Sequence, residues 1–349
     1  MIAPRSQPIW LVAIVLPAIL PALLGCTPAP ERFHSARPLM GTVVEITLYH
    51  PDQDRARELI DRAFAEMERI ERLMSIRIAA SEVARINREA YPGPIAVDRE
   101  VFDLIGRALE AWRETSGAFD ITVGPLMQLW PLYRAEKILP NDVQIGEALE
   151  RVGFDLLMLD PESSRIAFKK PGMSIDLGGI AKGYAIDRAI GVLRGGGVAS
   201  ALVNAGGDLY ALGLKPDGTP WRVGVRHPRR PEELIATLEV HDIAIMTSGD
   251  YERYFLKDGR RYSHIVDPRT GFTARGTAGV TLSAPIATWA DALATGVLVL
   301  GPDAGLELVN RLPQVEAAIL SEASEHRLKL TVSAGFAQVF RVDEGKLAY

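Results

Sequence analysis

Residues 176–187 read Asp-Leu-Gly-Gly-Ile-Ala-Lys-Gly-Tyr-Ala-Ile-Asp. This composition predicts a strand that ends in Gly178-Gly179 and a helix over residues 180–193. The first backbone N–H groups of a helix have no partner inside it, so such a junction can bind an anion such as phosphate. Taken alone, the pattern fits a tight structural turn equally well, and other parts of the sequence have to distinguish the two.

The rest of the chain divides into a part with helical periodicity and a part with short strands. Apolar residues at steps of three and four predict helices over 55–74, 101–115, 141–152 and 287–300. Short apolar or alternating runs predict strands over 42–49, 156–160, 165–168, 201–205, 208–213, 221–225, 244–248, 264–266, 328–332 and 336–342. We therefore predict one mixed α/β domain, of the α+β kind, over residues 40–349. Its N-terminal half is expected to be helical and its C-terminal half rich in sheet.

The N-terminus has the features of an export signal. Residues 9–24 carry no charge, but they are too few for a comfortable membrane span of about 20 residues. The segment ends in Leu-Leu-Gly-Cys at 23–26, which resembles a bacterial lipobox, and Cys26 is the only cysteine. We expect residues 1–25 to be a lipoprotein signal peptide and 26–39 to be a lipidated N-terminus with a polar tether. A plain secretory signal is the alternative.

The overall charge argues against one class of partner. The formal net charge is −5 at pH 7, and basic residues do not gather in one stretch. Proteins that bind nucleic acid usually carry a basic patch that neutralises phosphates. We therefore expect no nucleic-acid partner.

Two further clusters carry glycines and polar residues where a core would have Val or Leu. One is the segment 116–126, SGAFDITVGPL. The other joins 247–254, TSGDYERY, to 263–271, SHIVDPRTG. His264 lies three residues before Asp267 in a polar loop, although an isolated His-x-x-Asp pattern is more often structural than catalytic.

The last cluster predicts a cation site. Asp291 and Thr295 are four residues apart on the predicted helix 287–300, so their oxygens lie on one face. A carboxylate and a hydroxyl suit Mg²⁺, which keeps waters and phosphate oxygens as its other ligands. The alternative is that Asp291 favours the helix dipole while Thr295 packs inside.

Together these clusters resemble the ApbE family of FAD:protein FMN transferases. The resemblance lies in the following segments, which occur in the family's order: Met40-Gly41-Thr42, Met74-Ser75, SGAFDITVGPL (116–126), DLGGIAKGYAID (176–187), NAGGD (204–208), TSGDYERYF (247–255), YSHIVDPRTG (262–271) and ADALAT (290–295).

The resemblance implies a set of site residues. The FAD site would be lined by Met40, Ala118, Phe119, Asp120, Asp176, Lys182, Ile265 and Ala294. Mg²⁺ would lie between Asp291, Thr295 and the backbone carbonyl of Gly179. His264 would lie in the loop nearest the reacting phosphate.

The resemblance also implies a reaction. A Thr or Ser hydroxyl of another protein would attack the phosphorus on the FMN side of FAD, and AMP would leave. Mg²⁺ would polarise the phosphoryl oxygens, and Lys182 could add a second positive charge. His264 is our candidate for the base that activates the hydroxyl. Asp267 or another carboxylate of the same loop is the alternative.

One position departs from the family pattern. After Met74-Ser75 the family usually has Thr-Tyr, whereas this chain has Ile76-Arg77. A guanidinium is planar and can stack on a ring or pair with a phosphate, so we expect Arg77 to contact the flavin nucleotide. The change leaves open whether the acceptor is a protein hydroxyl or water. A Mg²⁺-dependent FAD pyrophosphatase giving FMN and AMP is therefore one alternative, and a non-catalytic flavin-binding lipoprotein is another.

The resemblance finally implies partners and a location. The acceptor would be a membrane subunit of a Na⁺-translocating NADH:quinone reductase or of an Rnf-type complex, flavinylated on its extracytoplasmic side. The protein would be anchored by lipid at Cys26 to a bacterial cell membrane, facing the periplasm. Thr27 is not the Asp that retains some lipoproteins in the inner membrane. Because those acceptors lie in the inner membrane, we nevertheless favour it over the outer one.

Overall fold

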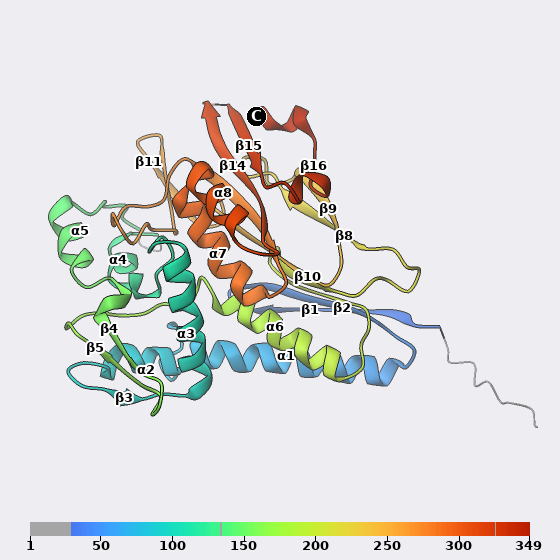
Figure 1. Cartoon of the computed structure of the whole chain (residues 1–349), viewed down its shortest axis with the longest axis horizontal. Helices are drawn as coiled ribbons and strands as arrows, with labels where there is room; N and C mark the ends of the chain where they lie inside the picture. Colours follow the sequence, from blue (N-terminus) through green and yellow to red (C-terminus); the bar gives the residue numbers. More distant parts are fainter. Residues whose placement is uncertain (1–28, 133–134, 325) are drawn as a thin grey trace, which may run out of the picture.

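The fold is built around a large antiparallel sheet. The computed structural model describes residues 29–132, 135–324 and 326–349, and within these ranges the sheet has eight strands (Figure 1). In spatial order they are β1 (Glu31–Leu39), β2 (Thr42–His50), β6 (Ala201–Ala205), β7 (Asp208–Leu212), β10 (Ile243–Gly249), β13 (Thr277–Ala284), β14 (Glu316–Ser324) and β15 (Arg327–Val332).

Four helices cover one face of this sheet, lying side by side in the order α1, α6, α7, α8. Their bounds are α1 (Gln53–Met74), α6 (Ala181–Gly195), α7 (Ala287–Leu300) and α8 (Pro302–Arg311). In α1 the residues Leu59, Ala63, Met67 and Ile70 are fully buried, as their spacing predicts. Burial of each large apolar side chain contributes about 1.5–3 kcal/mol, so this stripe fixes α1 against the sheet and α6.

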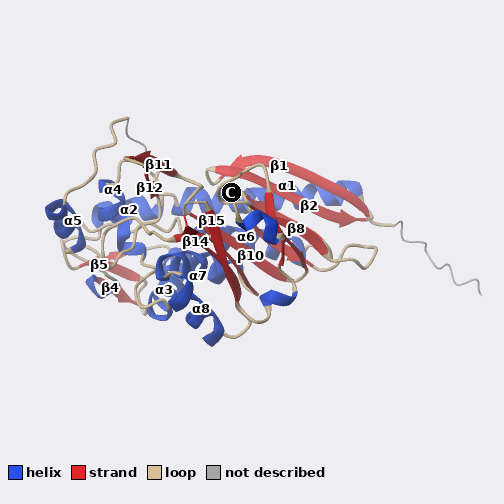
Figure 2. Ribbon diagram, turned by 90° about the horizontal axis from the view of Figure 1, so that it is seen from above, coloured by secondary structure: helices blue, strands red, loops and turns tan. Residues whose placement is uncertain are grey.

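The opposite face of the sheet packs on a second, three-stranded sheet of β8 (Trp221–Arg226), β9 (Leu234–Val240) and β16 (Arg341–Val342). The two sheets and the helical layer are seen from above in Figure 2. All eight residues of β13 are buried, because this strand lies between the two layers. Strands covered on both faces lose the alternation of polar and apolar residues. This explains why the sequence did not predict β13.

The remaining elements lie mostly at one end of the sheet (Figure 1). The helices are α2 (Glu82–Glu89), α3 (Arg99–Glu114), α4 (Gly124–Leu129) and α5 (Asp142–Leu149), and the 3₁₀ helices are η1 (Ile121–Val123), η2 (Phe154–Leu156), η3 (Phe336–Gln338) and η4 (Glu344–Leu347). The small sheets are β3 (Ile95–Ala96) with β5 (Arg165–Phe168) and β4 (Leu157–Asp160), and β11 (Tyr254–Lys257) with β12 (Arg260–Ser263). Asn141 caps α5 through a capping box with Gln144, as its position suggests.

The structure confirms the predicted mixed α/β class, but it corrects the N-terminal boundary. The prediction of a tether over residues 26–39 is wrong for residues 31–39, which form the edge strand β1. Its partly buried face carries two polar residues, Ser35 and Arg37, between Phe33 and Leu39, so the sequence ERFHSARPL shows no apolar alternation. Cys26 and the predicted signal peptide lie outside the described residues. Among the helices that are described, none is long and apolar enough to cross a membrane.

Three shorter predictions are also wrong. The residues before Gly178 form a loop and not a strand, because the backbone of Ile175 is hydrogen-bonded to the side chain of Asn87 at 2.8 and 2.9 Å. Residues 264–266 form a loop with a single bridge, and 336–342 form η3 followed by the short β16. In the latter segment Phe336 and Phe340 are both buried and stack at 5.3 Å, a helical spacing that we interpreted as part of a strand.

Candidate functional site

The site begins where α6 and α7 touch. The N–H of Gly183, in the first turn of α6, donates to a carboxylate oxygen of Asp291 on α7 at 2.9 Å. A Cβ atom at Gly183 would lie 2.2 Å from the carbonyl oxygen of Ala287 and 2.8 Å from the Cβ of Asp291. Only glycine allows the two helices to approach so closely. The Asp291 carboxylate is 5% exposed and satisfies a helix N–H that has no partner inside α6.

The three predicted metal donors lie near one another. A Cβ atom at Gly179 would lie 3.6 Å from the hydroxyl of Thr295, which is one turn from Asp291 on α7. The Thr295 hydroxyl also lies 3.3 Å from the hydroxyl of Ser248 on β10, a residue that our sequence analysis did not assign to the site. The structure thus gathers one buried carboxylate, two hydroxyls and the glycine loop in one place.

These donors fit a hard cation. Within the described residues there is no group of three or more His, Cys, Asp or Glu side chains that could hold a metal ion. The donors gathered here are oxygens, whereas a site of the zinc type uses several nitrogen or sulfur ligands. A single carboxylate with hydroxyl and carbonyl oxygens matches Mg²⁺, which retains waters and binds phosphate oxygens.

Lys182 and Asp208 form an ion pair beside these donors. The ammonium group of Lys182 contacts one oxygen of Asp208, and the other oxygen accepts the N–H of Thr247 at 2.9 Å. Burial disfavours the charge on Lys182, but Asp208 and Asp291 outweigh it and raise the pKa of the lysine. Burial raises the pKa of Asp291 to about 7. The charge of Lys182 opposes this rise, and the charge of Asp208 adds to it. The carboxylate of Asp291 thus lacks full charge compensation.

His264 lies in the loop after β12, and its geometry defines the tautomer. Its backbone N–H donates to the carbonyl oxygen of Arg253 at 2.9 Å, and its Nδ1 lies 3.3 Å from the same oxygen. Because a carbonyl only accepts, this contact requires Nδ1 to carry the proton, which leaves Nε2 with a free lone pair. Burial, then the charges of Arg253 and Lys182, lower the pKa of His264 to about 4. The imidazole is therefore neutral at pH 7.

The β1–β2 turn borders this loop. Met40 and Gly41 have φ values of 54° and 71°, the left-handed region that a tight hairpin turn requires. A Cβ atom at Gly41 would lie 3.3 Å from Nη2 of Arg253. The Arg253 side chain is exposed and is a cation that our sequence analysis did not select. Met40, Arg253 and His264 therefore lie on one side of the site.

Asp176 and Arg77 form another side. One carboxylate oxygen of Asp176 accepts the N–H of Gly178 at 2.8 Å, and its own N–H donates to the carbonyl of Ile121 at 2.7 Å. Burial raises the pKa of Asp176, while the nearby charges of Arg77 and Arg253 favour its ionised form. Arg77 is exposed and close enough to influence this carboxylate. The structure thus brings together two residues that were predicted separately.

Other predicted residues are engaged in the protein itself. The carboxylate of Asp120 accepts the N–H and hydroxyl of Thr122, both at 2.7 Å, and burial raises its pKa to about 6. The Asp267 carboxylate accepts three hydrogen bonds from Arg269, each 2.9 Å long, so it is a poorer candidate for a base than His264. Four other predicted residues have buried side chains: Ala118, Phe119, Ile265 and Ala294. The ring of Phe119 supports Gly179, since a Cβ atom there would lie 3.1 Å from it.

Asp208, Ser248 and Arg253 were missed as site residues although they belong to the polar segments 204–208 and 247–255. For Asp208 the sequence held an indication, because a carboxylate at the start of the apolar run 208–213 needs a partner if that strand is buried. For Ser248 and Arg253 the signal is weak, because Ser and Arg are common in exposed loops and strands. Their proximity to Thr295 and His264 comes from the tertiary structure.

Buried oxygen donors beside a lysine and a neutral histidine define a site suited to phosphoryl transfer, which requires positioned charges more than covalent chemistry. The comparison with known families agrees with this class. A sequence profile of the ApbE family matches residues 40–319. The chain belongs to the ApbE family.

Relatives cover nearly the whole chain. The FAD:protein FMN transferase of Vibrio cholerae is 34% identical over 318 residues, which are 87% of this chain and 92% of that protein. The FAD:protein FMN transferase of Treponema pallidum is 32% identical over 83% of this chain and 84% of its own. Among solved structures, the flavin transferase ApbE of Vibrio cholerae has a TM-score of 0.78 at 29% identity and covers 89% of this chain and 99% of its own. The ApbE protein of Thermotoga maritima has a TM-score of 0.81 at 35% identity and covers 88% and 99%.

The geometry of His264 predicts an unusual titration. The NMR signal of its imidazole, assigned by its loss in a His264→Gln variant, should titrate with a midpoint near pH 4 and not near 6.5. Between these pH values the folded protein binds fewer protons than the unfolded chain, so this residue lowers the free energy of unfolding as the pH falls from 6.5 to 4. The variant should lose stability less steeply in that window. A midpoint at or above 6.5 would contradict the environment described above.

Proposed function

We propose that this chain is an FAD:protein FMN transferase that uses Mg²⁺ and attaches FMN through a phosphoester bond to a Thr or Ser hydroxyl of another protein. The observation that carries the proposal is the meeting of Asp291, Thr295 and Gly179 with the Lys182–Asp208 pair. The relatives named above supply the substrate and the acceptor class.

In the proposed reaction, different residues of the protein accept the proton, supply positive charge and contact the nucleotide. The acceptor oxygen forms a bond to the FMN-side phosphorus, the bond from that phosphorus to the AMP-side oxygen breaks, and AMP leaves. The hydroxyl proton passes to Nε2 of His264, which carries the lone pair because Nδ1 donates to the carbonyl of Arg253. Lys182 and Arg253 supply positive charge for the phosphates. Arg77, whose charge acts on Asp176, would contact the nucleotide at the edge of the site.

The metal would be held by Asp291, Thr295 and the carbonyl of Gly179. When bound there, Mg²⁺ would act as a Lewis acid that polarises phosphoryl oxygens and lowers the charge on the departing phosphate. The free second oxygen of Asp291 suits this role, because the first is already occupied by the N–H of Gly183.

Asp291→Asn should remove activity without unfolding the protein. The asparagine carbonyl can still accept from Gly183, but the charge that attracts Mg²⁺ is lost, and we expect AMP release to fall by about 10²–10³-fold. Thr295→Val should lower it less, by about 10–100-fold. The assay mixes the protein with FAD, Mg²⁺ and a candidate acceptor and measures AMP together with a fluorescent acceptor band. Asp303→Asn, an exposed first-turn aspartate of the neighbouring α8, is the control and should behave as the wild type does. Normal turnover by Asp291→Asn at saturating Mg²⁺ would refute the ligand assignment.

A second candidate function is hydrolysis of FAD to FMN and AMP, which the exposed Arg77 favours. A charged, hydrated side chain could admit water where the ring expected from the family resemblance would exclude it, although a guanidinium stacked on the flavin would exclude water equally well. We favour the stacked arrangement because the other segments of the family pattern are intact.

Arg77→Tyr distinguishes these functions. For a transferase, the wild type should release about one AMP per flavin attached, and the variant should keep that ratio, because both side chains cover the same position. The measurement counts AMP by chromatography and attached flavin by fluorescence of the acceptor. If the wild type releases AMP and labels nothing, while the tyrosine variant labels the acceptor, the protein is a hydrolase.

We also propose that the protein is anchored by lipid at Cys26 on the periplasmic side of a bacterial cell membrane, the inner one being favoured. The support is the Leu-Leu-Gly-Cys sequence and the absence of any other cysteine. An acceptor in a membrane subunit of a Na⁺-translocating NADH:quinone reductase or an Rnf-type complex would then lie on the same membrane. Only residues 27–30 separate Cys26 from β1, and an extended chain spans at most about 3.3–3.6 Å per residue. The anchor would therefore hold the sheet close to the bilayer.

Cys26→Ala should release the protein from the membrane or leave it unprocessed, because no other residue can take the lipid. Several acyl chains hold firmly at about 0.8 kcal/mol per buried CH₂, so the wild type should sediment almost completely with membranes. Fractionation followed by detection of the protein measures this. Thr27→Ala, which leaves the cysteine in place, is the control. Equal membrane association of the wild type and Cys26→Ala would rule out the anchor.

A further inference from the structure

We propose that Asp187 is a positioning residue for the metal donors: it holds α7 against α6 so that Asp291 and Thr295 face Gly179. Asp187 ends the segment 176–187 but was given no role in the predicted site, and it contacts none of the proposed reacting groups. This inference rests on the proposed role of Asp291 and Thr295 in binding Mg²⁺. The inference adds a residue that keeps these two proposed metal donors in position.

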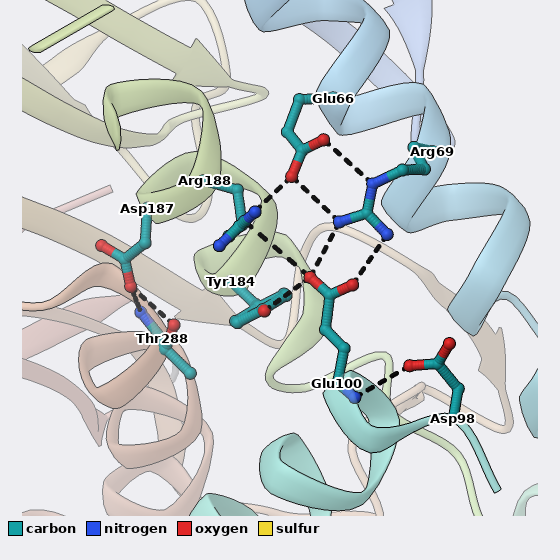
Figure 3. A network of polar contacts seen from close by, with 8 residues as sticks. All are labelled: Glu66, Arg69, Asp98, Glu100, Tyr184, Asp187, Arg188 and Thr288. Carbon is teal, nitrogen blue, oxygen red and sulfur yellow. Dashed lines mark hydrogen bonds and ion pairs between the residues drawn. The ribbon is translucent and has the colours of Figure 1, made fainter. Parts of the chain in front are cut away.

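Asp187 caps a helix other than its own. One of its carboxylate oxygens accepts the N–H of Ala287 at 2.9 Å. The other accepts the N–H of Thr288 at 2.8 Å and its hydroxyl (Figure 3). The residue that precedes α7, Ile286, has no side chain that can cap it. The first-turn N–H groups of α7 therefore depend on a carboxylate supplied by α6.

The contact is reciprocal. Asp187 on α6 binds the first turn of α7, while Asp291 on α7 binds the N–H of Gly183 in the first turn of α6. The two contacts are four residues apart on each helix, so they lie one turn apart along the interface. Two hydrogen-bonded contacts at that spacing restrict both the rotation and the sliding of α7 relative to α6. Without the Asp187 contact, only the hydrogen bond between Asp291 and Gly183 remains of these two contacts between α6 and α7.

The contact of Asp187 with α7 controls the geometry of the proposed metal donors, because these donors come from different elements. Gly179 lies in the loop that leads into α6, and Asp291 and Thr295 lie on α7. A small rotation of α7 would move the Asp291 and Thr295 oxygens relative to the Gly179 carbonyl. Mg²⁺ demands near-ideal octahedral geometry, so its affinity should be sensitive to such a shift. Outer residues that orient metal ligands typically change metal affinity by about 10–100-fold when mutated.

The next residue along the chain offers a matched control. Arg188 points to the other side of α6, where its Nε donates to Glu66 at 2.9 Å, and Tyr184 donates to Glu100 at 2.7 Å (Figure 3). Arg69 of α1 joins both glutamates in the same network. These contacts tie α6 to α1 and α3 but not to α7. Arg188 therefore tests whether any disturbance of α6 is enough to affect the metal donors.

The experiment measures binding of Mn²⁺ alone to the full-length protein by EPR, Mn²⁺ being a paramagnetic substitute for Mg²⁺ with the same preference for oxygen ligands. Asp187→Ala should weaken binding by about 10–100-fold, and Thr288→Val, which removes one of the three hydrogen bonds, by less. Asp187→Asn keeps the size and one acceptor oxygen, so it should give an intermediate affinity even if Asp187→Ala folds poorly. Arg188→Ala should lower the melting temperature and leave Mn²⁺ affinity unchanged.

Two outcomes would overturn the inference. One is wild-type Mn²⁺ affinity in both Asp187 variants while Asp291→Asn binds weakly, which would leave the proposed metal site intact and remove only the positioning role. The other is equal weakening by Arg188→Ala and Asp187→Ala, which would mean that any loosening of α6 has the same effect. Wild-type affinity in Asp291→Asn itself would instead refute the metal assignment of the proposed function, on which the inference depends.

Discussion

The close contact of α6 with α7 is the constraint on which the site depends. At Gly183 the two helices approach so closely that a Cβ atom would overlap the carbonyl of Ala287. This contact brings the loop with Gly179, the first turn with Lys182 and the inner face of α7 with Asp291 into one small volume. The large sheet below supports both helices and adds Asp208 and Ser248 from β7 and β10. The site is therefore a property of one helix–helix contact on a sheet, and not of a single loop.

Charge in this volume is incompletely balanced. Burial raises the pKa of Asp291 to about 7, and Lys182, which is paired with Asp208, opposes that rise only in part. A buried carboxylate of this kind costs stability unless a cation or proton joins it. The imbalance therefore supports the proposal that a divalent cation completes the site.

Sequence patterns predicted the parts of this structure that depend on local spacing. The helices α1, α3, α6 and α7 were found because their apolar residues recur every three or four positions, and the shared face of Asp291 and Thr295 followed from the same geometry. Strand β13 was missed because it is buried on both faces, and β1 because Ser35 and Arg37 interrupt the apolar residues on its partly buried face. The partners of Asp187 and Asp291 could not be predicted, since each binds a helix about 100 residues away in the sequence. Asn87, which holds the backbone of Ile175, is another such case.

The low pKa of His264 is compatible with a role as a base only when the charge around it changes. In the free protein, burial, Arg253 and Lys182 all disfavour the protonated imidazole, which makes Nε2 a weak base. A bound pyrophosphate would bring negative charge beside the same two cations and would favour protonation of His264. The base would thus gain strength when substrate occupies the site and remain weak when it is empty. Such coupling would suit the proposed transfer, because the free enzyme would activate neither water nor a stray hydroxyl.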